Sequence, residues 1–135
     1  MDYKLEVVVV PVSDADRSKA FYADRCGFVV DVDDSPNEHF RIVQLTPPGS
    51  ACSITIGKGI AKSEPGSLQG LQLVVTDIDA AREELVGRGL EVSRVRHVER
   101  SGEWVDGHGG PWNSFMFFED PDGNGWAIQE KPTEA

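Results

Sequence analysis

Cysteine is scarce in this 135-residue chain, and the two that occur, Cys26 and Cys52, stand alone. A disulfide-stapled scaffold needs several cysteine pairs, and a zinc knuckle or redox pair needs a Cys-x-x-Cys motif, which the sequence lacks. We therefore interpret both cysteines as small, semi-buried apolar side chains. Apolar residues make up 39% of the chain, which is enough for an ordinary packed interior.

Long apolar runs and an excess of positive charge are also missing. The longest apolar run, residues 7–12, contains Pro11 and has the length of a strand, whereas a membrane-spanning helix needs roughly 18 residues. Thirteen Lys and Arg stand against 23 Asp and Glu, so the net charge is −10. This balance argues against nucleic acid or membrane as a partner. Because no basic region precedes an apolar signal segment, we expect a cytoplasmic protein.

An internal repeat organises the chain. Residues 10–28 and 73–90 each contain an apolar strand, then Ser/Thr-Asp-x-Asp, then a helical pattern, then glycine and an apolar residue. Asp14 corresponds to Asp77, an offset of 63. The side chains at these positions can cap a helix N-terminus, as can the preceding Ser13 and Thr76. Gly27 and Gly89 are natural residues for ending the two helices.

Each half of the chain reads as strand, helix and three further strands. Module one covers residues 5–60, a linker covers 61–70, and module two covers 71–131, all within a single domain of residues 1–135. A half of about 60 residues buries too little surface alone, so we expect the two modules to share a core. The strands after the helices are expected at residues 28–32, 40–46, 52–57, 90–97, 114–118 and 126–130.

Two motifs carry a resemblance to a known family. Residues 13–28 read Ser-Asp-x-Asp-Arg, then Phe-Tyr, then Gly-Phe, and residues 120–124 read Asp-Pro-Asp-Gly-Asn before the last strand. With the internal repeat, they resemble the vicinal oxygen chelate superfamily, the glyoxalase I, bleomycin-resistance and extradiol-dioxygenase group, over about residues 5–130. The resemblance implies an α+β fold in which tandem β-α-β-β-β modules form a curled mixed sheet with a cavity. It also implies a homodimer whose two subunits wall that cavity.

The resemblance further implies a divalent metal held by side chains from four strands, and this chain offers none of the usual ligands there. A shift of one residue would bring Glu6 or Gln72 into play, but such a slip reverses the face of a strand. We therefore expect no metal and no other cofactor. The four positions are Val7, Leu71, Ala127 and one residue within 53–56, where only Ser53 and Thr55 are polar.

A largely apolar cavity without a metal suits a hydrophobic or aromatic small molecule. The segment 97–112 joins two strands of the second half and is expected to be a long loop over the cavity mouth. One interpretation makes it a lid whose Trp104 and Trp112 stack on a flat ligand, and the other makes it a polar loop packed on the domain or its dimer partner. The expected wall consists of Val7, Val9, Leu71, Leu73, Ala127 and Gln129.

Three function classes remain open. The preferred one is a homodimeric protein that binds a small hydrophobic or aromatic molecule, as in the sequestration of a drug or toxin. The alternative is an enzyme of the same fold, a lyase, isomerase or dioxygenase, that uses His108 and Glu103 of the loop, or a non-standard metal site. No nucleophile and base stand at a recognisable spacing, so the sequence does not decide whether the chain is an enzyme. The third class is a structural or regulatory interaction module.

Overall fold

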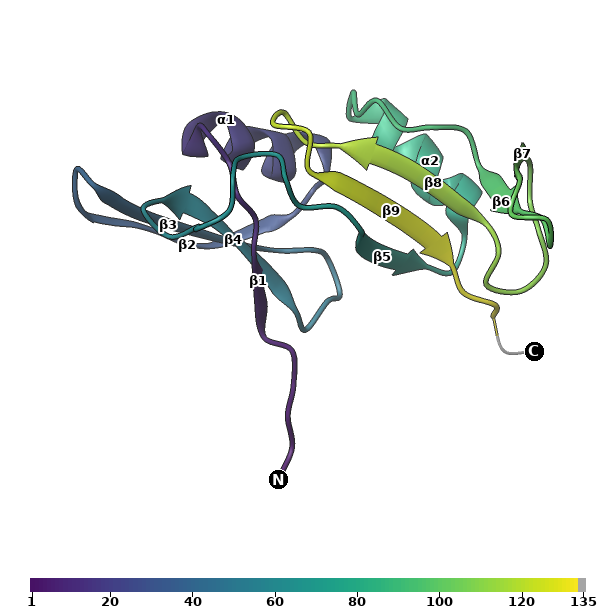
Figure 1. The fold of residues 1–135 in the computed structure, drawn as a ribbon, viewed down its shortest axis with the longest axis horizontal. Coiled ribbons are helices and arrows are strands. Elements are labelled where there is room, and N and C mark those ends of the chain that lie inside the picture. The colour runs from purple at the N-terminus through teal and green to yellow at the C-terminus, as the bar shows by residue number, and fades with distance from the viewer. Residues whose placement is uncertain (134–135) are drawn as a thin grey trace. The chain divides into compact units, whose positions relative to one another are not determined.

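The computed structural model describes residues 1–133 as two compact units, each built on one sheet (Figure 1). The first unit contains residues 1–68 and 120–124, and the second contains residues 69–119 and the chain from Gly125 onward. No helix among residues 1–133 is long and apolar enough to span a membrane. The single domain predicted from the sequence stays a prediction.

The first unit carries a four-stranded sheet in the order β1-β4-β3-β2. Strand β1 runs parallel to β4, and the other pairs are antiparallel. Helix α1 lies on one face and continues as a π-helical turn, Phe21–Arg25. The elements are β1 (Val7–Val9), α1 (Ala15–Ala20), β2 (Val29–Asn37), β3 (Phe40–Thr46) and β4 (Ser53–Lys58).

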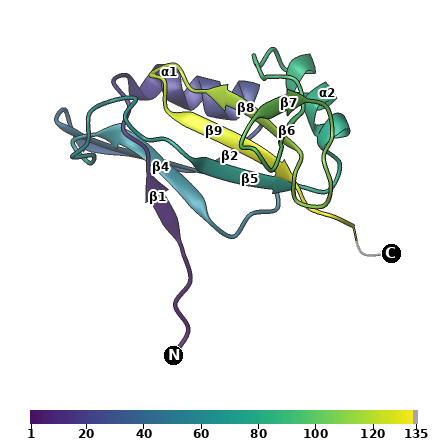
Figure 2. The ribbon, with the colours of Figure 1, turned by 45° about the vertical axis from the view of Figure 1, so that its right-hand side comes forward.

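The second unit repeats this order around a five-stranded sheet, β5-β9-β8-β6-β7, and β5 again runs parallel to the last strand (Figure 2). Helix α2 contacts β9. The elements are β5 (Leu71–Val75), α2 (Ile78–Gly87), β6 (Arg96–Val98), β7 (Trp104–Asp106), β8 (Phe115–Glu119) and β9 (Gly125–Glu130). The predicted α+β class and its two β-α-β-β-β modules are confirmed, with β7 as an addition.

Both predicted helix starts and helix ends are confirmed. The Asp14 carboxylate accepts from the Arg17 amide at 3.1 Å, and the Asp77 carboxylate accepts from the Ala80 amide at 3.0 Å. Each bond satisfies one of the free amides at a helix N-terminus. Gly27 and Gly89 adopt φ of +74° and +87°, a left-handed conformation that glycine tolerates at no steric cost.

Buried side chains alternate along β3, β8 and β9, whereas the first four residues of β4 are all buried. In the first unit Val43, Leu45, Ile54 and Ile56 are buried on the face that α1 contacts. In the second unit the corresponding buried set on β8 and β9 is Met116, Phe118, Trp126 and Ile128. We call these the core faces. The opposite face of each sheet has no helix of its own unit, and it carries the intervening residues.

The strand expected at residues 90–97 is wrong for its first part, since only Arg96–Val98 is a strand. At Ser93 one backbone bond to β8 remains, from the Ser93 amide to the Phe117 carbonyl at 2.9 Å, and side-chain bonds satisfy the other groups. The Phe117 amide donates to the Ser93 hydroxyl at 2.9 Å, and the Ser93 carbonyl accepts from Arg82 Nε at 3.0 Å. A serine that bonds the neighbouring backbone in this way competes with regular pairing.

The long loop expected over residues 97–112 is also wrong in part, because its first half is a β-hairpin. Strand β7 pairs with β6, and the Glu99 amide donates to the Glu103 carbonyl at 2.8 Å across the turn. The hairpin makes β7 the last strand of the sheet. It therefore holds Trp104 at a fixed register on the sheet rather than on a loop.

Candidate functional site

A cluster of aromatic side chains covers the helix-free face of the second unit's sheet. Phe115 pairs with Gln129, and Phe117 pairs with Ala127, so these four residues share the face opposite Met116 and Trp126. Trp104 pairs with Val98 on β6, and Arg96 of the same strand pairs with Phe115. We call the surface formed by Trp104, Phe115, Phe117, Ala127 and Gln129 the aromatic face.

The three rings of the aromatic face are in mutual contact. The Trp104 indole meets Phe115 edge-on at 5.5 Å and Phe117 edge-on at 5.3 Å between ring centroids, and the two phenyl rings lie parallel at 6.3 Å. Such pairs each contribute about 0.5–1.5 kcal/mol beyond their buried area. Trp104 remains 38% exposed, and both phenylalanines are half-buried. The cluster is thus held in place internally while its rings stay partly uncovered.

The predicted wall residues fall on different faces of the second sheet. Ala127 and Gln129 lie on the aromatic face. Leu71 and Leu73 pair with Trp126 and Ile128 instead, so they lie on the core face, and their assignment to the same wall is wrong. The reason is a one-residue slip, which turns every side chain of a strand to the other side.

The register of the internal repeat identifies the residue that takes the place of Leu73 in that wall. The offset of 63 that relates Asp14 to Asp77 places Gln72 in the position of Val9. Gln72 pairs with Ala127 and therefore shares the aromatic face. The sequence thus contained the correct register, since the same offset relates both helix caps.

In the first unit, the predicted wall residues Val7 and Val9 lie on the face opposite the core. Val7 pairs with Ser53 and Val9 with Thr55, whereas Val8 pairs with the core residue Ile54. Val7 and Val9 are both partly exposed, and the two hydroxyl side chains beside them are buried. This surface offers apolar side chains and hydroxyl groups, but no ionisable group at these four positions.

The residues at the implied metal positions do not fit a divalent ion. The positions named from the sequence hold Val7, Leu71, Ala127 and the hydroxyl residues Ser53 and Thr55. Gln72, which pairs with Ala127, and Gln129 offer only amides, which are weak ligands for transition metals. Among residues 1–133, no three His, Cys, Asp or Glu side chains gather in a way that could hold an ion. The absence of a metal remains a prediction, and the chemistry of the donor set supports it.

Trp112 occupies a strained turn at the border of the aromatic face. Gly110-Pro111-Trp112-Asn113 is closed by a bond from the Asn113 amide to the Gly110 carbonyl at 3.0 Å. Trp112 adopts φ of +64°, a value found at no other non-glycine residue of the described chain. A left-handed conformation costs such a residue on the order of 1 kcal/mol. Its carbonyl accepts from Gln129 Nε2 at 2.8 Å, which ties the turn to the sheet.

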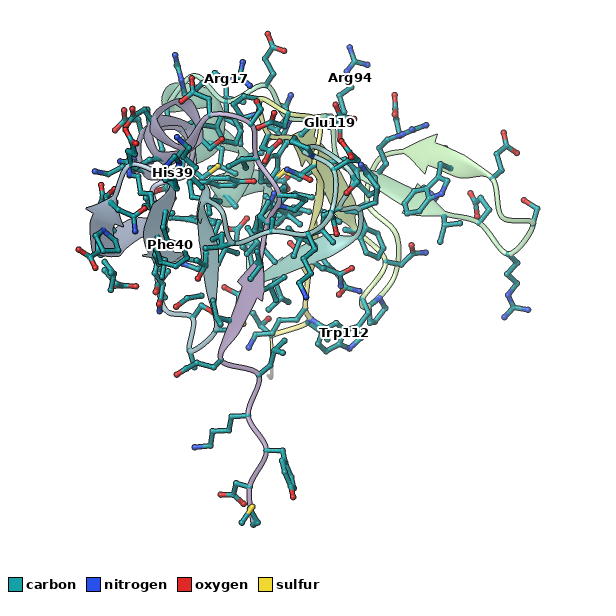
Figure 3. All side chains as sticks on the ribbon, turned by 60° about the vertical axis from the view of Figure 1, so that its left-hand side comes forward. Arg17, His39, Phe40, Arg94, Trp112 and Glu119 are labelled. Atoms are coloured by element: carbon teal, nitrogen blue, oxygen red, sulfur yellow. The ribbon has the colours of Figure 1, made fainter. Side chains whose placement is uncertain are left out.

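The Trp112 side chain is 52% exposed (Figure 3). No ring contact joins it to Trp104, Phe115 or Phe117 in the described chain. The prediction that Trp104 and Trp112 stack on a ligand stays a prediction. Trp104 belongs to the aromatic face, and Trp112 is linked to it through its backbone and Gln129.

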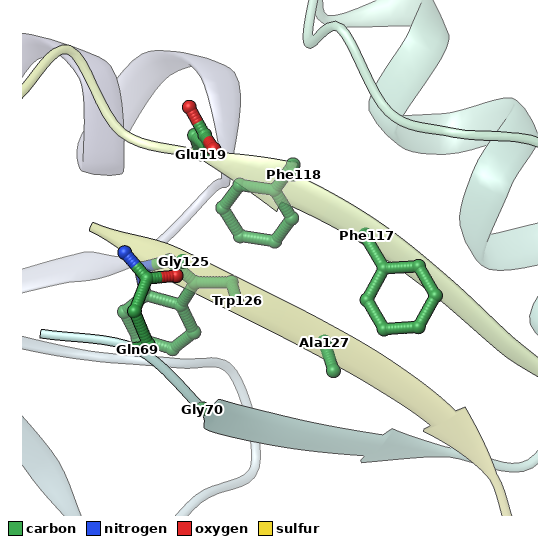
Figure 4. A pocket seen from close by; sticks show the side chains of 8 residues that line it. All are labelled: Gln69, Gly70, Phe117, Phe118, Glu119, Gly125, Trp126 and Ala127. Carbon is green, nitrogen blue, oxygen red and sulfur yellow. The ribbon is translucent and has the colours of Figure 1, made fainter. Parts of the chain in front are cut away.

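A pocket of about 420 Å³ lies at the end of the aromatic face (Figure 4). Phe117 and Ala127 extend the aromatic face into it, and Glu119 is its one charged lining residue. Its wall is formed by strands β8 and β9 and by the two residues before β5. A largely apolar lining with few polar groups is typical of sites for small organic molecules. The remaining lining residues are Gln69, Gly70, Phe118, Gly125 and Trp126.

The catalytic candidates His108 and Glu103 have different surroundings. His108 Nε2 lies 2.8 Å from Asp79 Oδ2, in the first turn of α2. Glu103 lies at the tip of the β6–β7 hairpin, where its backbone bonds Ser101 and Glu99. No hydrogen bond joins the two side chains in the described part of the chain, so a His108–Glu103 acid–base pair has no geometric support.

His97 is fixed by two oxygen atoms of the hairpin. Its Nδ1 lies 2.9 Å from the Gly107 carbonyl, and its Nε2 lies 3.1 Å from a Glu99 carboxylate oxygen. The Gly107 carbonyl oxygen and the Glu99 carboxylate oxygen both accept hydrogen bonds from the protonated ring. They therefore raise the pKa of His97 above its ordinary 6.5, and the Gly107 carbonyl has the larger effect. The hydrogen bonds of the protonated His97 ring therefore stabilise the folded state. This stabilisation is fully present below about pH 6.5 and is lost as the pH rises through the folded-state pKa of His97.

We expect the His97 imidazole to titrate with a midpoint above about 6.5 in an NMR pH titration. In Glu99→Gln the midpoint should fall while staying above the ordinary value, because the Gly107 carbonyl remains. The hairpin amides should exchange faster above the folded-state pKa than below it, beyond the intrinsic pH dependence of exchange. A His97 midpoint at or below the ordinary value would contradict the hydrogen bonds described.

Known proteins share both the sequence pattern and this fold. The family model described as Glyoxalase/Bleomycin resistance protein/Dioxygenase superfamily matches residues 4–128. The chain belongs to this superfamily. The resemblance inferred from residues 13–28 and 120–124 is thereby confirmed. No curated protein matches the chain significantly.

Solved structures of superfamily members extend the likeness over almost the whole chain. TnmS3, an antibiotic binding protein from Streptomyces sp. CB03234, is 32% identical, with 98% of each chain covered and a TM-score of 0.75. A glyoxalase/bleomycin resistance protein from the same organism is 33% identical over 93% of this chain and 99% of its own, with a TM-score of 0.71. A superfamily member from Sphaerobacter thermophilus DSM 20745 is 25% identical over 96% and 98%, with a TM-score of 0.73.

Proposed function

We propose that this chain binds a small, flat, largely apolar molecule on the aromatic face, without a metal and without transforming it. The observation that carries the proposal is the contact cluster of Trp104, Phe115 and Phe117 on a sheet face that has no helix of its own unit. Partly exposed aromatic rings that are already packed together bind flat ligands at low entropic cost.

The comparisons support the class of ligand. TnmS3 is described as an antibiotic binding protein, and the chain covers nearly all of it at 32% identity. Binding an antibiotic-like molecule is a role that needs shape and apolar surface, and no catalytic group. The aromatic face and its pocket supply these, so sequestration of a drug or toxin is the role we propose.

One observation favours the alternative, an enzyme of the same fold. His108 and Asp79 form a hydrogen-bonded pair at 2.8 Å, the arrangement in which a carboxylate orients an imidazole for proton transfer. Both side chains are largely exposed. The pair lacks a neighbouring nucleophile, so binding remains the function with the broader support.

The test of binding is a panel of two- and three-ring aromatic compounds measured by isothermal titration calorimetry and thermal shift. A ligand that binds only the folded chain must raise its melting temperature in proportion to the logarithm of its concentration. Matched aliphatic compounds of similar volume serve as the control, and we expect them to bind more weakly. If no aromatic compound of the panel binds at millimolar concentration, the proposal is wrong.

The metal-free state predicts a clear outcome with divalent ions. Titration of the purified chain with Ni²⁺, Zn²⁺ or Mn²⁺ should give no stoichiometric binding, because amides and hydroxyls are poor ligands for these ions. Treatment with EDTA should leave both the melting temperature and aromatic-ligand binding unchanged. One tightly bound ion per chain, with a higher melting temperature, would overturn the metal-free proposal.

We also propose that the chain forms a homodimer. Tyr3 and Leu5 lie on alternate positions of the N-terminal segment before β1, and both are largely exposed, as Val7 and Val9 are in part. A second copy of the chain would cover such side chains. Light scattering should therefore give about twice the 14.8 kDa of one chain.

A further inference from the structure

Two glutamine side chains of the aromatic face hydrogen-bond in series. Gln72 Nε2 donates to Gln129 Oε1 at 2.7 Å, and Gln129 Nε2 donates to the Trp112 carbonyl at 2.8 Å. Gln72 comes from β5, Gln129 from β9, and Trp112 from the turn before β8. A polar chain of amides therefore connects the edge of the sheet to the strained turn.

The Trp112 carbonyl fixes the orientation of both amides. A backbone carbonyl only accepts, so Gln129 must turn its nitrogen toward Trp112 and its oxygen toward Gln72. Gln72 must then turn its own nitrogen toward Gln129, which leaves its Oε1 facing away from the pair. Among the described residues, no donor contacts Gln72 Oε1. The two hydrogen bonds in series thus leave Gln72 Oε1 as an oriented acceptor beside the aromatic face.

The strand register places this acceptor at the end of a row of three side chains, of which the middle one is small. Gln72, Ala127 and Phe117 occupy one row across β5, β9 and β8. With strands about 4.8 Å apart, Gln72 and Phe117 are about 10 Å from each other along the row. The small side chain of Ala127 between them leaves room for two or three fused rings. A ligand resting there contacts Phe117 at one end and reaches Gln72 at the other.

We propose that Gln72 Oε1 selects ligands that carry a hydrogen-bond donor, a hydroxyl or an amine, on the edge of an aromatic ring system. This inference rests on the proposed function, since it uses the same face. Gln72 would accept the bond from the ligand directly. Gln129 is a positioning residue, because it acts by holding the Gln72 amide in the accepting orientation.

The test compares 2-naphthol with 2-methoxynaphthalene, which share a ring system but differ in the donor. We expect the wild-type chain to bind 2-naphthol about fivefold to tenfold more tightly, the range that one net hydrogen bond supplies. In Gln72→Met, which keeps the length of the side chain, the preference should fall to within twofold. The ratio of the two affinities within each variant is the internal control, because a change in apolar contact at this position affects both compounds alike.

Gln129→Met tests the orientation of the acceptor. Without Gln129, the Gln72 amide is free to rotate, so we expect a preference between those of wild type and Gln72→Met. A second readout is the side-chain amide signal of Gln72 in a ¹⁵N NMR spectrum, assigned by its loss in Gln72→Met. It should shift further on saturation with 2-naphthol than with 2-methoxynaphthalene, because only the naphthol donates a hydrogen bond to the amide.

The outcomes separate this inference from the proposed function. If both naphthalenes bind the wild-type chain equally, or if Gln72→Met keeps the preference, the selection by Gln72 is wrong while binding on the aromatic face stands. If neither compound binds and the wider aromatic panel also fails, the proposed function is wrong and the inference falls with it. Melting curves of both variants establish that each is folded.

Discussion

Replacing Asp120 with alanine is expected to lower the free energy of unfolding by about 3–4 kcal/mol. The Asp120 side chain is buried in the β8–β9 turn beside the π-helical turn that follows α1, where Tyr22 Oη donates to its Oδ2 at 2.7 Å. Asn124 donates to the same carboxylate twice, from its side chain at 2.8 Å and from its backbone at 2.9 Å. Alanine would leave all of these buried donors without their acceptor, and each such donor costs about 1–3 kcal/mol.

Urea unfolding followed by far-UV circular dichroism measures this loss as a lower midpoint at an unchanged slope. Tyr22→Phe removes a single donor and should cost about 1–2 kcal/mol. Asp122→Ala in the same turn is the graded comparison. The Asp122 side chain is only 7% exposed, but its partners Ser13 and Arg17 are themselves exposed, so water can reach the donors that it leaves. We expect a loss of about 1–2 kcal/mol, smaller than that of Asp120→Ala. Equal losses in Asp120→Ala and Asp122→Ala would refute the buried network.

This network gives a structural role to the motif on which the superfamily resemblance was based. Asp120-Pro-Asp-Gly-Asn124 connects two strands of the second unit, yet it packs within the first unit. Asn124 is fully buried and bonds Pro11, Leu68 and Asp120. The turn uses these residue types to satisfy its buried polar atoms. The motif therefore indicates the fold, and the surface that we propose for the ligand lies elsewhere.

Local signals in the sequence were sufficient for the helices and for the module order. Caps and left-handed glycines act within a few residues, and both pairs of helix ends were predicted at Asp14, Asp77, Gly27 and Gly89. The extent of β6 was not predictable in this way. It depends on a side-chain bond between Ser93 and Phe117, which are 24 positions apart and meet only in the folded sheet.

The aromatic face was predicted only in part, for a related reason. Phe115, Met116, Phe117 and Phe118 are all apolar, so alternation cannot tell which of them faces the core. The pairing with β9 decides it, and Phe115 and Phe117 were missed as site residues. Trp104, Ala127 and Gln129 were named from the sequence and lie on the aromatic face, and their role in ligand binding stays a prediction. The repeat offset could have identified Gln72, because it maps Val9 onto that position.

Replacing Trp104 with alanine should weaken binding of a two- or three-ring aromatic ligand by about 30-fold. A central aromatic residue of a binding surface typically contributes 2 kcal/mol or more, and 1.4 kcal/mol corresponds to a factor of ten. Trp104 contacts both Phe115 and Phe117, so its loss also frees these rings from their fixed positions. Titration calorimetry is the suitable measurement, because the substitution itself removes a fluorescent reporter.

Two variants distinguish the effect of losing the Trp104 ring from the effect of losing the fold. Trp104→Phe keeps an aromatic ring at the same register of β7, and we expect it to lose no more than about threefold in affinity. Trp104→Ala should still fold, since Trp104 lies partly exposed on an edge strand and the core faces are untouched. If Trp104→Ala is folded and binds within twofold of wild type, the ligand does not use the aromatic face. A loss in Trp104→Ala that Trp104→Phe restores would locate the ligand on this surface, because the two variants differ only in the ring.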